Sequence, residues 1–166
     1  LSAYRLGGLV QRTLEVETYR TLALLGLPVA KRAVKVVNHV QDELTRLTGK
    51  IAKAERIEDN RSLLKDLTDL AAELEAQAAS TAFRFGASIA YHDIVAVRLS
   101  NMHEASIAGA RRFSSFFKRR LDPAIATCRS VQERQNRLSQ KLARTAELLR
   151  TRIQFELEQQ NRDLLE

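Results

Sequence analysis

The feature that most constrains this chain is a stripe of apolar and small residues that recurs every four or three positions. The stripe continues over long stretches without a helix breaker, and it runs from Leu67 to Met102 with the same alternation. This alternation is typical of one helix face that packs against another helix. The residues that carry the stripe after Pro28 are Ala33, Val37, Val40, Leu44, Leu47, Ile51 and Ala54. We therefore predict two helices, over residues 28–55 and 62–103, that form a coiled-coil-like hairpin.

Three further helices are expected. Residues 3–25 have a broad apolar face, residues 110–121 form a short amphipathic segment, and residues 123–165 continue with helical periodicity. Asp122 followed by Pro123 is a typical helix start, because an Asp side chain caps the first N–H groups and proline fits the first helical position. The apolar face expected on the first helix comprises Leu6, Leu9, Val10, Leu14, Val16 and Leu24.

The composition fits a fold made only of helices. Two prolines, six glycines and no Trp occur in 166 residues, and residues with good helix propensity fill the long tracts. We predict an all-α, elongated antiparallel bundle that forms a single domain over residues 1–166, with the first helix extending the second across Gly26–Pro28. The chain begins at Leu1 and ends within a helical pattern at Glu166, so we expect a fragment of a longer protein.

The charge balance favours anionic partners without identifying them. The net charge is +7, but Arg and Lys alternate with Asp and Glu along most of the chain, which disfavours nucleic-acid binding. No apolar run is long enough to span a bilayer, so the fragment itself is expected to be soluble. A single cysteine, Cys128, cannot form an intrachain disulfide, and we interpret it as a small buried hydrophobic residue.

Motifs for catalysis or for cofactor binding are not found in the sequence. None of His39, His92 and His103 follows a Glu by three residues, which is the spacing that helical di-metal sites use. A glycine-rich phosphate loop, a nucleophile elbow and zinc-ligand spacing are also missing. We therefore expect a protein that is not an enzyme and that has no cofactor, catalytic or metal site.

Two sets of residues stand out as candidate sites. Glu17 and Arg20 interrupt the apolar face of the first helix at neighbouring positions, which predicts a buried polar pair that fixes helix register or contacts a polar group. In the segment from Arg111 to Leu121, we expect Phe113, Phe116 and Phe117 to be buried at the end of the bundle. Arg111, Arg112, Lys118 and Arg119 are then expected in solvent. The alternative is that this segment contacts a membrane surface or an acidic partner.

Several blocks of the sequence resemble a known family. They are residues 9–20, residues 24–30, Asp122-Pro123-Ala124 with Cys128, and residues 159–166. Together they are similar to the bacterial domain-of-unknown-function family 3422, whose members are described as membrane-anchored helical proteins. The resemblance implies a parent chain with an additional N-terminal region and a C-terminal hydrophobic anchor. It implies no activity and no catalytic residue.

These observations favour a scaffold function. We expect a non-enzymatic helical scaffold or oligomerisation module of a membrane-anchored bacterial protein, located at the cytoplasmic face of the inner membrane, with protein partners and self-association. The first alternative is the cytoplasmic helical domain of a CorA-like ion-transport assembly, by analogy of architecture alone. The second is a nucleic-acid-binding helical protein.

Overall fold

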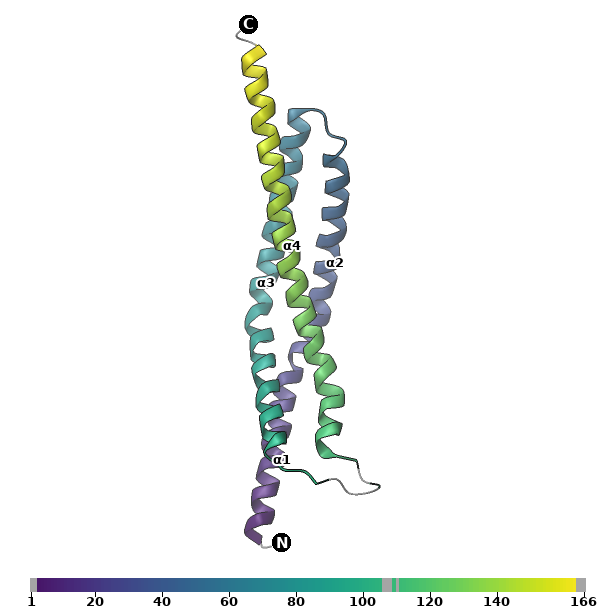
Figure 1. The fold of residues 1–166 in the computed structure, drawn as a ribbon, viewed down its shortest axis with the longest axis vertical. Helices are drawn as coiled ribbons and strands as arrows, with labels where there is room; N and C mark the ends of the chain where they lie inside the picture. Colours follow the sequence, from purple (N-terminus) through teal and green to yellow (C-terminus); the bar gives the residue numbers. More distant parts are fainter. Residues whose placement is uncertain (1–2, 106–108, 110, 164–166) are drawn as a thin grey trace. The chain divides into compact units, whose positions relative to one another are not determined.

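The described part of the chain is helical, as the sequence predicts. The structure is a computed structural model that describes residues 3–105, 109 and 111–163, and these residues form four α-helices and no strand. The helices are α1 (Ala3–Leu24), α2 (Gly26–Ile51), α3 (Ile57–Ser100) and α4 (Phe113–Asp163) (Figure 1). The long helices pack against one another, which confirms the all-α bundle.

The chain divides into two compact units, and the boundaries between them fall within α2, α3 and α4. Unit 1 comprises Leu1–Arg32 and Thr81–Gln132, and unit 2 comprises Ala33–Ser80 and Glu133–Glu166. Each unit therefore contains a segment of α3 and a segment of α4. Unit 1 also contains α1 and the first turns of α2, and unit 2 contains the rest of α2.

Unit 2 is a three-helix arrangement with a continuous apolar core. Of the stripe predicted after Pro28, Val37, Val40, Leu44 and Leu47 are at most 1% exposed, whereas Ile51 and Ala54 are half-buried. Arg134 of α4 donates hydrogen bonds to Asn38 (2.7 Å) and Gln41 (3.1 Å) of α2. α2 and α3 form an antiparallel hairpin through residues 52–56.

A polar network on α4 holds the hairpin loop of unit 2. Arg152 donates hydrogen bonds to two carbonyl oxygens. One belongs to Ile51, the last residue of α2 (3.2 Å), and the other to Ala54 in the loop that follows (2.6 Å). The Arg152 side chain also pairs with Glu156 at 2.9 Å, and Glu156 accepts hydrogen bonds from the buried Asn60 in the first turn of α3. The network therefore holds the segment that follows α2, and α2 ends at Ile51 rather than at residue 55.

Unit 1 has its own hydrophobic cluster, to which α1, α3 and α4 all contribute. α1 runs antiparallel to α3, with Glu15 3.4 Å from Arg98 and Tyr19 stacked on Tyr91. The buried members of the cluster are Val16, Ala23, Val95, Leu99, Phe117, Leu121 and Ile125. Because both candidate segments from the sequence lie in this unit, the cluster positions them relative to each other.

The junction between α1 and α2 is a single non-helical residue, Leu25. The next residue is Gly26, and the surrounding helices leave no room for a side chain at this position. A Cβ atom on Gly26 would lie 2.4 Å from Ser88 Oγ on α3 and 3.0 Å from Cys128 Sγ on α4. Pro28 lies in the first turn of α2, where its missing N–H costs no helical hydrogen bond. The glycine thus allows three helices to approach closely.

The helix start predicted at Pro123 is absent. One helix, Phe113–Asp163, replaces the two helices predicted over 110–121 and 123–165, and Pro123 lies inside it. The predicted ends at residues 110 and 165 lie outside the described residues. An interior proline removes one helical hydrogen bond, but the buried face is continuous across it, through Phe117, Leu121, Ala124 and Cys128. Packing on both sides of Pro123 therefore keeps the helix intact.

Candidate functional site

The Glu17–Arg20 pair forms on α1, at the edge of the unit 1 core rather than inside it. Arg20 Nε donates a 2.8 Å hydrogen bond to Glu17 Oε2, and Arg20 Nη2 is equally close to the same oxygen. The side chain of Glu17 is 41% exposed and that of Arg20 is 23% exposed. The predicted burial is therefore only partial. The guanidinium carbon of Arg20 lies 5.8 Å from the centre of the Phe117 ring, so the structure brings the two candidate segments together.

The apolar face predicted on α1 is largely uncovered. Of its six residues only Val16 is fully buried, and Leu24 is half-buried. The other four are between 46% and 61% exposed, and we call them the α1 apolar face: Leu6, Leu9, Val10 and Leu14. Two reasons apply. The first turns of α1 extend past the ends of α3 and α4 in this unit (Figure 1), and Leu14, farther along, points roughly 160° away from the core residue Val16. The core side of α1 is instead formed by Val16 and Ala23.

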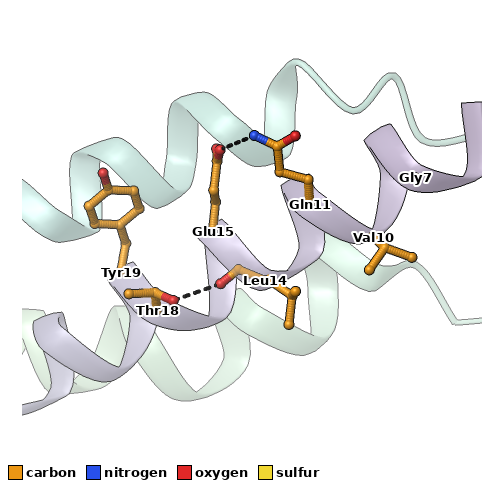
Figure 2. A pocket seen from close by; sticks show the side chains of 7 residues that line it. All are labelled: Gly7, Val10, Gln11, Leu14, Glu15, Thr18 and Tyr19. Atoms are coloured by element: carbon orange, nitrogen blue, oxygen red, sulfur yellow. Dashed lines mark hydrogen bonds between the residues drawn. The ribbon is translucent and has the colours of Figure 1, made fainter. Parts of the chain in front are cut away.

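A shallow groove of about 430 Å³ runs along the surface of α1 beside this face (Figure 2). Its walls are two rows of residues four positions apart, one with Val10, Leu14 and Thr18 and the other with Gly7, Gln11, Glu15 and Tyr19. Side chains of a neighbouring helix fit into grooves between such rows when two helices pack. Gly7 opens one end of the groove, since no atom lies within 4 Å of the position its Cβ would take.

The three phenylalanines near the start of α4 have three different environments. Phe117 is 1% exposed and Phe113 is half-buried, with their ring centres 4.4 Å apart. Phe116 is 60% exposed, so the prediction that all three rings are buried is wrong for this residue. The reason is helical geometry, because consecutive residues differ by about 100° and Phe117 occupies the core direction.

The basic residues of this segment face solvent. Arg111, Arg112, Lys118 and Arg119 are all exposed. A surface hollow of about 550 Å³ is lined by the half-buried Phe113 and by five exposed residues that we call the α4 basic face: Arg111, Arg112, Ser115, Phe116 and Arg119. This face combines three guanidinium groups, a hydroxyl group and an aromatic ring.

Glu104 caps the start of α4. Its carboxylate accepts hydrogen bonds from the backbone N–H groups of Phe113 and Ser114, the latter at 3.0 Å. The hydrogen bond from Ser114 is the main reason that the pKa of Glu104 is lowered from its usual 4.5. Glu104 thus supplies the cap that the sequence suggested for Asp122. Asp122 instead lies 3.0 Å from His92 Nε2, which joins α3 to α4.

The described residues offer little for chemistry. No group of three or more His, Cys, Asp and Glu side chains among them is placed to hold a metal ion. Cys128 is fully buried, and burial raises the pKa of its thiol, which disfavours the reactive thiolate. No described helix is long and apolar enough to cross a membrane.

Sequence reasoning missed two of the polar features that the structure shows. Arg152 and Glu156 are four residues apart, a spacing that indicates an ion pair, but periodicity does not reveal that their partners are Asn60 and the carbonyl groups that close the hairpin. The Glu104 cap joins residues nine and ten positions apart through a connecting segment, for which no spacing rule exists.

Comparison with known proteins identifies a family and no function. No curated protein matches the chain, and no solved structure matches it. A model of one protein family matches residues 1–166, the whole chain. The chain therefore belongs to the family described as "Protein of unknown function (DUF3422)".

Proposed function

We propose that the chain is a non-enzymatic helical scaffold or oligomerisation module of a membrane-anchored bacterial protein. Its partners are proteins, including further copies of itself. The family resemblance implies a membrane anchor in regions outside these 166 residues. The chain itself lies at the cytoplasmic face of the inner membrane. The observation that carries the proposal is the α1 apolar face, whose four large side chains are about half exposed.

An apolar face of this kind is unusual for a surface that contacts only water. Contiguous exposed apolar residues are typical of protein interaction sites, whereas single exposed ones are common anywhere. Leu6, Val10 and Leu14 are each four residues apart, so they form one row along α1 beside the groove. A row and an adjacent groove are the two elements that a packing helix requires, which supports a helical protein as the partner.

The non-enzymatic part of the proposal is supported by the only thiol and by the polar pairs. The Cys128 thiol is buried inside unit 1. The Glu17–Arg20 and Arg152–Glu156 pairs connect groups within the chain, so their charges already have partners.

The test uses the complete parent protein in its native membrane. We expect the double variant Leu6→Glu/Leu14→Glu to release the protein from its assembly, because two carboxylates would be buried in the interface. The matched control is Leu148→Glu/Phe155→Glu, which changes two exposed apolar residues on α4. The measurement is the size of the detergent-solubilised assembly. An unchanged size for the α1 variant would contradict the proposal, as would an equal loss for the control.

Two further observations separate the alternatives. An ion-transport assembly requires pore-lining membrane helices in the parent protein, whereas a scaffold requires only an anchor. Nucleic-acid binding would weaken steeply with salt, but an apolar interface would not. A complex that resists salt and depends on Leu6 and Leu14 therefore favours the scaffold.

A further inference from the structure

We propose that the α4 basic face binds the phosphate headgroups of an anionic phospholipid surface, with Phe116 inserted at the edge of the acyl region. This site is separate from the α1 apolar face. It does not depend on the scaffold function, which concerns protein partners.

The first argument is unbalanced charge. Residues 105–121 contain five basic residues and no acidic one. None of Arg111, Arg112 and Arg119 has an acidic partner within ion-pair distance among the described residues, whereas Arg129, Arg150 and Arg152 on the same helix each have one. The nearby Glu104 caps α4 and also interacts electrostatically with Arg112, but a single carboxylate offsets only part of the positive charge of this stretch. The face therefore attracts anions that the described chain does not supply.

The second argument is geometry. Three arginines and Ser115 are among the residues that line one hollow of about 550 Å³. Arginine binds phosphate oxygens through paired N–H donors, and a hydroxyl group adds a further donor. Arg112 directly precedes α4, and its carbonyl oxygen accepts hydrogen bonds from the N–H groups of Ser115 and Phe116. Arg119 lies on the helix and lines the same hollow as these three residues. A phosphate group held there would contact both arginines.

The third argument is the exposed ring of Phe116, which selects a lipid over a free phosphate. The ring of Phe116 is 60% exposed and lies among arginines, and it would contribute nothing to the binding of an inorganic anion. Beside a phospholipid headgroup, however, the same ring reaches the acyl boundary, where aromatic side chains with basic neighbours are typical of interfacial binding. Lys118 and Arg120, also exposed, flank this face and add to the attraction of an anionic surface.

The site is preorganised by contacts already described. Phe117 packs in the core, and the centres of the Phe116 and Phe117 rings are 5.5 Å apart in an edge-to-face arrangement. The Glu104 cap fixes the first turn of α4. Ordering the face before binding lowers the entropic cost of binding. The other exposed aromatic ring on α4, Phe155, has Glu156 and Glu158 as neighbours, so it provides a matched control.

The experiment measures binding of the full chain to vesicles of equimolar phosphatidylcholine and phosphatidylglycerol, compared with vesicles of phosphatidylcholine alone. We expect salt-sensitive binding to the anionic vesicles only. Each arginine removed should lower the affinity about fivefold, so Arg111→Gln/Arg112→Gln/Arg119→Gln should lower it about a hundredfold. The control Arg137→Gln/Lys141→Gln/Arg144→Gln removes the same charge elsewhere on α4 and should have an effect of about fivefold or less.

Two substitutions to Trp report the insertion of the ring, because the chain contains no Trp of its own. The emission of Phe116→Trp should shift to shorter wavelength when anionic vesicles are added, and that of Phe155→Trp should not. Phe116→Ala should weaken vesicle binding about tenfold and should leave the binding of inorganic phosphate unchanged.

Several results would overturn the proposal. Equal losses in the two triple variants would show a non-specific charge effect, and an unchanged Phe116→Trp spectrum would show that the ring stays in water. If inorganic phosphate competes with the vesicles and Phe116→Ala leaves vesicle binding unchanged, the hollow would be assigned to a free anion. Tighter binding of a single-stranded oligonucleotide with the same residue dependence would assign the face to nucleic acid. A melting curve for each variant confirms that it is folded.

Discussion

α2 and the first half of α1 have similar apolar faces in the sequence but opposite environments in the structure. Val37, Val40 and Leu44 of α2 are at most 1% exposed, while Leu6 and Leu14 of α1 are more than half exposed. Around α2, segments of α3 and α4 in its own unit cover the face. The first turns of α1 extend past the neighbouring helices of its unit (Figure 1), and Leu14, farther along α1, points away from the core residue Val16. Periodicity therefore predicts an apolar face, but it does not predict what covers it.

Phe116 and Phe117 offer the sharpest test of this difference, because they are adjacent and chemically identical. Phe117→Ala should lower the free energy of unfolding by about 3 to 5 kcal/mol, since it leaves a cavity in the unit 1 cluster. Phe116→Ala should change the same free energy by no more than about 0.5 kcal/mol, because its ring is exposed. Chemical denaturation of both variants measures the difference. Similar losses would mean that Phe116 is also a core residue.

Two glycines extend the comparison to backbone packing. Gly26→Ala should destabilise the chain by about 2 to 3 kcal/mol, because the new Cβ would overlap Ser88 Oγ. Gly7→Ala should stabilise α1 by about 0.5 to 1 kcal/mol, since nothing lies within 4 Å of that Cβ and alanine has the higher helix propensity. Thermal melting of each variant shows whether the substitution raises or lowers the stability of the folded chain.

A double-mutant cycle identifies the cause at Gly26. In the background of Ser88→Gly, both Ser88 atoms nearest to the new Cβ are gone, so the added cost of Gly26→Ala should fall by more than half. An unchanged cost would mean that the strain arises elsewhere in the junction.

The smallest expected effect concerns the cap at the start of α4. The pKa of Glu104 is lowered in the folded chain, chiefly by the hydrogen bond from the Ser114 N–H. The carboxylate therefore stabilises the folded state above its unfolded pKa of 4.5, and this contribution is lost as the pH falls through the lower folded pKa. The protection of the Ser114 amide, which is its exchange rate compared with the intrinsic rate at the same pH, should fall in that acidic range. In Glu104→Gln the exchange should not show this acid transition, and a transition that persists would point to another carboxylate.

Much of the fold could be predicted from the sequence. The stripes on α2 and α3 and the scarcity of breakers predict the bundle, since periodicity depends on local geometry. The start signal at Asp122-Pro123 failed for a reason that the sequence contains. The buried residues Phe117, Leu121, Ala124 and Cys128 keep their spacing of four and three across Pro123, and tertiary packing of that face outweighs the local cost of the proline.

The candidate site was predicted less completely. The Glu17–Arg20 contact follows from a spacing of three on one helix, but its exposure depends on which side of α1 the other helices cover. The same holds for Phe116, whose direction follows from that of Phe117 only once the core is known. The Arg152 network and the Glu104 cap join residues far apart in the chain or across a connection. They could not be predicted from a pattern within one helix.

The most direct test of the central claim, that the α1 apolar face is open in this chain and covered in the assembly, is the labelling rate of a cysteine at position 14. Leu14→Cys should react quickly with a thiol reagent in the dilute purified chain, because this residue is 61% exposed. The native Cys128 should react slowly in both settings, since it is buried and its pKa is raised. In the parent protein in its native membrane, Leu14→Cys should react at least about tenfold more slowly, while the control Leu148→Cys should keep its rate. Equal rates for Leu14→Cys in the two settings would contradict the account, because they would show that nothing covers this face.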